Sequence, residues 1–416
     1  MKVFLINPNR YKAPPVPPIG LEYISASIER GGHSAEMLDL CFTEDAYKDL
    51  DSAVAAFSPD IAGITVRNID TVLYQTNEFF LDEIREIVGH IKSGHGLKVI
   101  IGGTGVSANP EGVLDYLGAD FVIDGPAEGN IIECLNEICN PASKRRIYNG
   151  RYYPRTKCSR TIEKTGYRKY FENSGIAGFE THKGCSSSCA YCIEANTRVV
   201  FKDPEDVVSE VRGIVDMGYS HFHLCDSEFN EDLDYSIEFC NALKKAGMGI
   251  KWAVYMKPAN FNRKLFSLMK DTGVYLITLT VDSFRKCPMY WSDTEKIVFN
   301  AKAAGIKIIV DFLAGFPYEE EDVLLECLDL LRRVQPDSVN INTYIRLYKS
   351  LYITRIIMND AKLKENLLGS TEDDSLIKPV FYNHLTTDRL RELIKGEKIF
   401  HIEGFEKTVN YSRVGI

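Results

Sequence analysis

The chain has 416 residues, of which 45% are hydrophobic and 26% are charged. This length is too great for one ordinary core and predicts two or three domains, and the composition is that of a globular protein rather than a disordered or fibrous one. The formal net charge of −9 argues against broad binding of nucleic acid, so we do not expect nucleic acid as a partner.

The sequence also bears on location. No apolar run approaches the roughly 20 residues needed to span a bilayer, and the first residues lack the basic start and apolar stretch of a signal peptide. We therefore expect a cytoplasmic protein that does not enter a membrane. In that reducing compartment the eleven cysteines should be buried thiols, metal ligands or catalytic groups rather than disulfides.

Residues 1–140 alternate short apolar strands with amphipathic helices. Helical spacing is seen at Leu21, Ile24 and Ile28, and again in a long segment from residue 80 to 91. The expected strands are residues 3–7, 35–40, 60–66, 99–101 and 121–123. This alternation predicts a doubly wound, Rossmann-like α/β domain, whose ligands bind at the carboxyl ends of the parallel strands.

Residues 141–175 break the alternation and are predicted to form a linker, because turn signals and basic residues replace the apolar pattern. Strands and helices then alternate again over residues 176–350. The expected strands are residues 179–182, 221–224, 250–255, 275–281, 306–312 and 338–345. Six strand–helix units predict a partial (β/α)6 barrel, short of the eight that close one. Residues 351–416 are predicted as a short C-terminal appendage, with a helix after Thr387-Asp388.

Three cysteines, Cys185, Cys189 and Cys192, lie in a loop of small residues directly after the first strand of the second domain. Four thiolates would saturate a [4Fe–4S] cluster, whereas three leave one iron open for another ligand. A zinc site is the structural alternative. Zinc normally takes two C-x-x-C pairs or histidines at matching spacing, however, and His182 lies on the predicted strand. The triplet therefore favours a catalytic cluster.

The triplet, with aromatic Tyr191 before its third cysteine, resembles the signature of radical S-adenosylmethionine (SAM) enzymes. Further segments that resemble this family follow predicted strands: Cys225-Asp226-Ser227-Glu228-Phe229-Asn230, Val281-Asp282-Ser283-Phe284, Gly315-Phe316-Pro317 and Arg346-Leu347-Tyr348. Asp282 stands where the family usually has a longer Glu. The resemblance covers residues 176 to about 350. It implies that the cofactor-binding residues of the barrel are Tyr191, Asp226, Glu228, Asp282, Ser283 and Arg346.

The resemblance also implies a reaction. In this family the amino and carboxylate groups of SAM chelate the open iron of an oxygen-sensitive cluster. An electron from an external donor of the flavodoxin or ferredoxin type then cleaves SAM to a 5′-deoxyadenosyl radical. The cofactors carry this step, and the protein positions and shields them.

The N-terminal domain lacks the glycine fingerprint of a dinucleotide-binding fold, since Asn7-Pro8-Asn9-Arg10 follows its first strand. The segments 14–23, 102–111 and 124–129 instead resemble the cobalamin-binding domains that are fused to radical SAM barrels. Glycines at a strand end would allow close approach of a bulky ligand. The cofactor-binding residues that this resemblance implies are Asn7, Pro18, Gly102, Gly103, Thr104, Ser107, Gly125 and Glu128.

Two departures leave the surroundings of the cobalt open. The chain has no Asp-x-His-x-x-Gly motif, so no histidine is nominated as the lower axial ligand. Gly105 stands where relatives often have a histidine after the double glycine. A domain with only a structural role is the alternative to cobalamin binding.

A cobalamin domain joined to a radical SAM barrel implies transfer of a methyl group from methylcobalamin to an unactivated carbon. Cyclisation or rearrangement with the same cofactors, methylthiolation and a metal-stabilised binding module are the alternatives. Methylthiolation would need a second cluster, for which the N-terminal cysteines lack a coherent spacing. The short appendage favours an open site for a peptide or protein segment, with a small metabolite as the other option. The catalytic candidates near strand ends, which core packing explains equally well, are Tyr255, Tyr344 and Tyr348.

Overall fold

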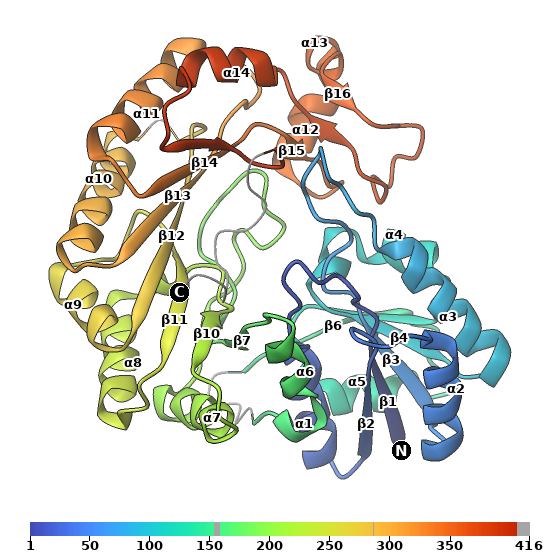
Figure 1. The fold of residues 1–416 in the computed structure, drawn as a ribbon. Helices are drawn as coiled ribbons and strands as arrows, with labels where there is room; N and C mark the ends of the chain where they lie inside the picture. The colour runs from blue at the N-terminus through green and yellow to red at the C-terminus, as the bar shows by residue number, and fades with distance from the viewer. Residues whose placement is uncertain (154–158, 286, 406–416) are drawn as a thin grey trace.

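The computed structural model describes residues 1–153, 159–285 and 287–405. Its N-terminal part is a six-stranded sheet of parallel strands in the order β2-β1-β3-β4-β5-β6 (Figure 1). In such a sheet ligands bind where the strand order reverses, which here is between β1 and β3. The strands are β1 (Lys2–Asn7), β2 (Ser34–Asp39), β3 (Ile61–Thr65), β4 (Val99–Gly102), β5 (Phe121–Asp124) and β6 (Ile147–Asn149).

Helices cover both faces of this sheet, as the doubly wound pattern predicts. Successive side chains of a strand point to opposite faces. Val3 and Leu5 therefore pack in one buried cluster with α1 and α5, whereas Phe4 and Ile6 pack in another with α2, α3 and α4. The helices are α1 (Ile19–Arg30), α2 (Ala46–Phe57), α3 (Leu81–His95), α4 (Pro110–Leu117) and α5 (Ile131–Ile138).

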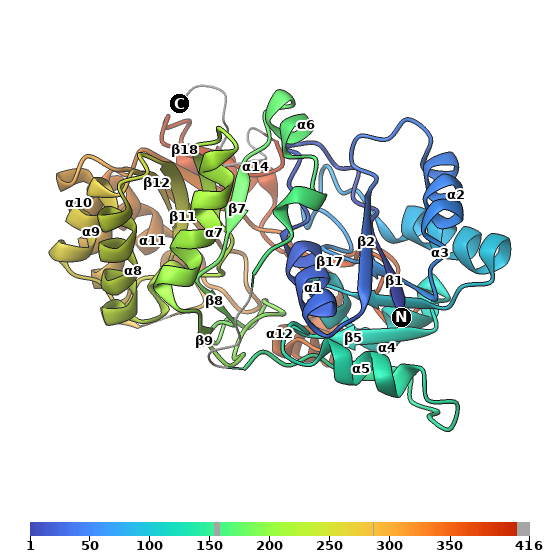
Figure 2. The same cartoon turned by 90° about the horizontal axis from the view of Figure 1, so that it is seen from below.

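The second sheet has the order β18-β14-β13-β12-β11-β10-β7, and its strands also pair in parallel. Helices line the outer side of this sheet (Figure 2). Sheet and helices together form a partial barrel. Its strands are β7 (Ala177–Phe179), β10 (His221–Leu224), β11 (Lys251–Met256), β12 (Val274–Asp282), β13 (Lys307–Leu313), β14 (Ser338–Asn342) and β18 (Phe400–Ile402). Its helices are α7 (Pro204–Asp216), α8 (Leu233–Ala246), α9 (Arg263–Asp271), α10 (Pro288–Ala303), α11 (Glu321–Val334) and α14 (Thr387–Ile394).

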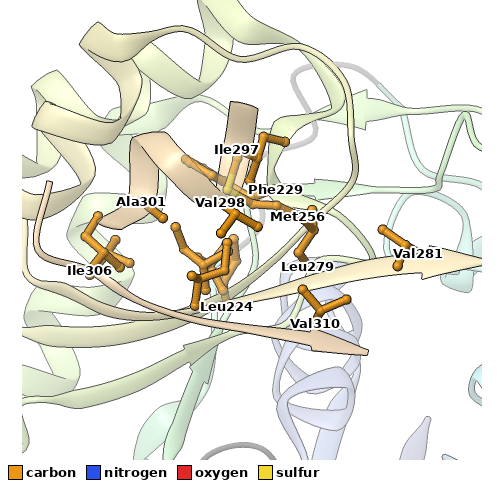
Figure 3. Packing of buried hydrophobic residues seen from close by; sticks show 14 of the residues in the cluster. Leu224, Phe229, Met256, Leu279, Val281, Ile297, Val298, Ala301, Ile306 and Val310 are labelled. Atoms are coloured by element: carbon orange, nitrogen blue, oxygen red, sulfur yellow. The ribbon is translucent and has the colours of Figure 1, made fainter. Parts of the chain in front are cut away.

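The largest buried cluster lies between this sheet and its helices. Figure 3 shows Ile297 and Val298 of α10 packed over Leu279 of β12 and Val310 of β13, all of them fully buried. Burial of one such side chain contributes about 1.5–3 kcal/mol. The outer layer of helices therefore holds the strands in place and fixes the positions of the loops at their carboxyl ends.

The C-terminal segment differs from the appendage that the sequence predicted. Phe400 of β18 pairs with Val339 of β14, so the barrel has a seventh strand in place of the six expected. A small antiparallel sheet also packs in the same buried cluster as α2, α3 and α4. This segment thereby joins the two domains. Its elements are β15 (Ile345–Arg346), α12 (Tyr352–Met358), α13 (Ala361–Lys364), β16 (Leu367–Leu368) and β17 (Phe381–Tyr382).

The segment predicted as a linker is also more structured than expected. Strand β6 lies beyond residue 140 and extends the N-terminal sheet, and α6 (Tyr167–Glu172) follows later in the segment. Arg160 donates through Nε to Glu22 of α1 at 2.7 Å, and both side chains are buried. The domain boundaries stay predictions, but the segment that connects the two domains is held by contacts with both of them. Cys158, to which we assign no role, lies outside the described residues.

Candidate active site between the two sheets

The cysteine triplet lies in a loop closed by a short antiparallel pair of strands, β8 (His182–Lys183) and β9 (Val200–Phe201). Gly184 opens the loop with φ = +88°, and a Cβ there would lie 2.2 Å from the carbonyl oxygen of Arg198. Only glycine fits this crossing. Thr197 closes the loop, because its Oγ1 accepts from the Cys185 amide at 2.9 Å and its own amide donates to the Cys185 carbonyl at 3.0 Å.

The three thiols are close to one another and partly shielded. Cys185 is buried, and Cys189 and Cys192 are half-buried. Burial, with added repulsion from the charges of Glu194, Cys189 and Cys185, raises the pKa of the free Cys192 thiol to about 12. Burial also raises the pKa of Cys189, and Arg285, which donates to Cys189 Sγ at 3.1 Å, opposes this effect.

The spacing of the three sulfur atoms distinguishes a site for an iron–sulfur cluster from a site for a single zinc ion. The ligand atoms of a single ion converge on one point. The sulfur atoms of the three cysteines are not all within 4.8 Å of one another. Among the described residues, only one set of possible metal ligands is that compact, and it does not include these cysteines. In a cluster each thiolate binds a different iron, so this wider spacing is expected. The donor set therefore fits a [4Fe–4S] cluster.

The carboxylates predicted at the end of β10 have different surroundings. Asp226 accepts from the Thr181 amide at 2.8 Å and forms a buried pair with His182 at 3.2 Å, so its charge is used within the protein. Glu228 accepts from Thr280 Oγ1 at 2.5 Å, while its buried Oε2 has no hydrogen-bond partner among the described residues. Burial raises the pKa of Glu228 to about 8. Glu228 is thus the carboxylate with an unused acceptor.

The end of β12 contacts the cysteine loop directly. Tyr191 donates its hydroxyl to Asp282 Oδ2 at 3.2 Å, and Asp282 Oδ1 accepts from the Arg285 amide at 3.1 Å. The Ser283 amide donates to the carbonyl of Leu313, which fixes it on the neighbouring strand. The structure therefore brings Tyr191 and Asp282 together near Cys189, with Ser283 next in the chain, and their roles in binding the cofactor stay predictions.

A cavity of about 1,090 Å³ lies between the two sheets. This is larger than the roughly 300–1,000 Å³ of an ordinary small-molecule pocket and suits a bulkier ligand. The barrel contributes Asp226 and Tyr255 to its wall. From the N-terminal domain, the wall includes all eight residues that the sequence nominated, namely Asn7, Pro18, Gly102, Gly103, Thr104, Ser107, Gly125 and Glu128.

Three further predicted site residues are held by contacts within the protein. Arg346 is buried, pairs with Asp70 at 2.8 Å and donates to nearby backbone carbonyls, so its guanidinium is occupied within the protein. Tyr348 is buried beneath that guanidinium at 4.5 Å, and Tyr344 stacks on Tyr74 at 4.8 Å. None of the three is among the described residues that line the cavity. Burial, with smaller contributions from the charges of Asp70 and Cys192, raises the pKa of Tyr348, so Tyr348 lies near the cysteine loop. The roles of all three residues in the site stay predictions.

Two family models match the chain. The model of the B12 binding domain matches residues 13–135, and the model of the radical SAM superfamily matches residues 179–331. The chain therefore carries a B12-binding domain followed by a radical SAM domain. The fold class and the cofactors that the sequence predicted, cobalamin and SAM with its cluster, are thereby confirmed.

Curated relatives and solved structures agree with this assignment. The chain is 22% identical over 434 residues to a tryptophan 2-C-methyltransferase of Streptomyces laurentii, covering 83% of this chain and 72% of the relative. It is 22% identical over 400 residues to a cytidylyl-2-hydroxyethylphosphonate methyltransferase of Streptomyces wedmorensis, covering 76% and 73%. The structure of the radical SAM methyltransferase TsrM of Kitasatospora setae, with cobalamin and a [4Fe–4S] cluster bound, superposes with a TM-score of 0.82 at 21% identity, over 98% of this chain and 93% of that one.

The structure gives a local packing reason for two glycines of the B12-binding domain, Gly103 and Gly105. A Cβ on Gly103 would lie 2.7 Å from the Val66 carbonyl oxygen, and a Cβ on Gly105 would lie 2.8 Å from the same atom. Their missing side chains therefore make room for the neighbouring strand end, and Gly103 also lines the cavity. Close packing against Val66 also accounts for Gly105 at the position where relatives often have a histidine.

Arg67 and His223 are among the cavity residues that sequence reasoning missed. Arg67 follows β3 in the B12-binding domain, and His223 lies on β10 of the radical SAM domain. Burial, reinforced by the charge of Arg67, lowers the pKa of His223 to about 3, so its imidazole is neutral at ordinary pH. The alternation of His223 with buried Phe222 and Leu224 was a signal that it faces the barrel interior.

None of the helices in the described part of the chain is long and apolar enough to cross a membrane.

Proposed function

We propose that this chain is a cobalamin-dependent radical SAM methyltransferase that adds a methyl group to a carbon atom of its substrate. The observation that carries the proposal is the shared cavity, whose wall is formed by the B12-binding domain on one side and by the ends of β10 and β11 on the other. Both similar curated relatives are methyltransferases, one of them named for carbon 2 of tryptophan.

The residues of the barrel would hold the iron–sulfur cluster and SAM. When bound, these groups supply one-electron cleavage chemistry, and cobalamin supplies a methyl carrier. Cys185, Cys189 and Cys192 would bind three irons. Glu228 would accept a hydrogen bond from the SAM ammonium through its unused Oε2, since a carboxylate that remains unpaired in a buried site is costly. Asp282 would act indirectly, because its hydrogen bond with Tyr191 would hold the cysteine loop in position.

On the other side of the cavity, the strand ends of the B12-binding domain would hold cobalamin. Asn7, Thr104 and Ser107 already hydrogen-bond to neighbouring residues, which fixes their orientation toward the cavity wall. His223 and Tyr255 would contact cofactor or substrate from the barrel side, with their rings 5.4 Å apart. A neutral His223 could accept a hydrogen bond there.

We propose a small molecule as the substrate. The sequence favoured a peptide because a short appendage would leave the site open, but residues up to 402 pack into both domains. That structure removes the reason for an open site. The two methyltransferases named above act, by their names, on tryptophan and on a nucleotide-linked phosphonate, which are both small molecules. The flavodoxin- or ferredoxin-type electron donor and the cytoplasmic location remain predictions.

The test uses anaerobically reconstituted protein, SAM with an isotope-labelled methyl group, a reductant and extracts of cells that lack the gene. We expect label in one small-molecule product and none with Cys185→Ala, whereas Cys139→Ala, an exposed cysteine of the other domain, should behave as wild type. Label in a protein fraction would reassign the substrate class. A product without label would favour cyclisation or rearrangement, and zinc without iron in the purified protein would overturn the enzymatic proposal.

A further inference from the structure

Two helices on the outer face of the B12-binding domain bring together a second set of metal-ligating side chains. Asp51 lies on α2, and His90 and His95 lie on the last turns of α3. The Nε2 atoms of both histidines are 2.7 Å from the same oxygen, Asp51 Oδ1. All three ligand atoms lie within 4.8 Å of one another, and none of these residues is among those that line the cavity.

We propose that Asp51, His90 and His95 form a binding site for a divalent transition-metal ion, with Zn²⁺ as the best-suited species. Imidazole and carboxylate are ligands that Zn²⁺ accepts, and a set of two histidines and one carboxylate leaves a fourth position for water. The three side chains expose 52%, 29% and 20% of their surface, so water and the ion can reach the site.

The backbone that carries the three ligands is fixed by the domain core. Asp51 follows fully buried Leu50, and His90 lies between the buried residues Val88 and Ile91. The ring of Tyr47 also lies 4.8 Å from the ring of His90 and supports it. A site on two packed helices needs little reorganisation when the ion binds, which favours affinity.

The distances are compatible with an ion after a small expansion. Ligand bonds of about 2.0–2.2 Å in a tetrahedron place the ligand atoms about 3.3 Å apart, compared with the 2.7 Å seen between each Nε2 and Asp51 Oδ1. Rotation of partly exposed side chains can supply this difference.

The same geometry offers an alternative without a metal, in which both imidazoles donate to one oxygen. In that arrangement both Nε2 atoms must carry hydrogen, and the carboxylate oxygen is shared. An ion at the point of convergence would instead use both Nε2 lone pairs and separate the three ligand atoms. Binding experiments distinguish these two arrangements directly.

The experiment measures zinc per chain in untagged protein that already contains its cluster and cobalamin, because empty cluster cysteines would bind zinc themselves. After dialysis against micromolar Zn²⁺, wild type should hold one zinc more per chain than the His90→Ala/His95→Ala variant. Asp51→Asn, which is nearly isosteric and keeps the fold even where the double variant does not, should weaken zinc binding by at least about tenfold. His33→Ala, a histidine of the same domain, should leave the stoichiometry unchanged.

Thermal unfolding gives a second readout that does not depend on activity. Zinc should raise the unfolding midpoint of wild type and of His33→Ala, because a ligand that binds only the folded state stabilises it. It should not raise the midpoint of Asp51→Asn by a comparable amount. Equal zinc content in wild type and in the Asp51→Asn and double variants would overturn the proposal, as would an equal loss in His33→Ala, which would indicate adventitious binding.

Discussion

Lys183 Nζ lies 2.8 Å from Glu128 Oε1. Lys183 directly precedes Gly184 and Cys185 of the cysteine loop, whereas Glu128 belongs to the loop after β5 of the B12-binding domain. The charges of Glu128 and Glu180 hold the pKa of Lys183 well above its usual range despite the opposing effect of burial. This ion pair links the loops that would hold the two cofactors, and so helps to set their separation.

Glu128→Gln tests that link. The variant leaves Lys183 paired with Glu180 alone, so we expect a loss of about 1–3 kcal/mol in the free energy of unfolding. Misplacement of one cofactor relative to the other should lower methyl transfer by about tenfold or more, while SAM cleavage falls less. The two rates are measured on the same reconstituted sample. Glu133→Gln, an exposed position on α5, is the control, and an equal fall of both rates in Glu128→Gln would contradict the proposed link.

The buried pair of Arg160 and Glu22 predicts a larger effect on stability. Arg160 also donates to the Gly178 carbonyl of β7 at 2.8 Å, so it joins α1, the connecting segment and the barrel. Arg160→Met leaves a buried carboxylate without its partner and should cost about 3–5 kcal/mol. The measurement is the denaturant midpoint. Arg168→Met removes an exposed pair with Glu172 and should cost less than about 0.5 kcal/mol; similar costs for the two variants would refute the prediction.

Glu228 predicts a pH dependence of stability in the cofactor-free protein. Its pKa is raised to about 8 in the folded state, so the folded protein binds this proton more tightly than the unfolded chain. The stabilisation is therefore complete below the unfolded pKa of about 4.3 and is lost as pH rises toward 8, by at most about 1.4 kcal/mol per pH unit. Glu228→Gln should lack this fall, and Glu238→Gln, an exposed residue of α8, should keep it.

Proton release on SAM binding checks the proposed role of Glu228. A SAM ammonium beside Glu228 would favour the ionised carboxylate, so wild type should release a proton when SAM binds near pH 7. Calorimetric titrations in buffers with different ionisation enthalpies measure this proton. The same release in Glu228→Gln would assign the ammonium to another residue.

Gly184 provides a test of the cysteine loop. Gly184→Ala would place Cβ 2.2 Å from the Arg198 carbonyl oxygen, which prevents the loop from closing, so iron per chain should fall severalfold. Gly218 is a matched control, because it has φ = +92° but open space around the site of a Cβ. Gly218→Ala should cost about 1–2 kcal/mol through backbone strain and keep its full iron content. Equal iron content in the two variants would show that the crossing does not govern cluster binding.

The sequence by itself determined the features that depend on short-range spacing. The period of the apolar residues predicted the strands of both sheets other than β6 and β18, and His221–Leu224 was predicted at its observed bounds. The Cys185, Cys189 and Cys192 triplet indicated a cluster because its ligands come from one loop. Segments at strand ends indicated the wall of the cavity, since parallel strands end at the same edge of a sheet.

The tertiary structure decided which distant residues meet, because such pairings are set by packing rather than by local pattern. Residues 400–402 become the seventh strand of the barrel through pairing with β14, and their length alone gave no such signal. Arg346 pairs with Asp70, which is 276 residues away, a partner that the sequence alone did not indicate. The position of Lys183 beside Glu128 likewise depends on how the two domains pack, because the sequence alone does not show which distant charged residues form an ion pair.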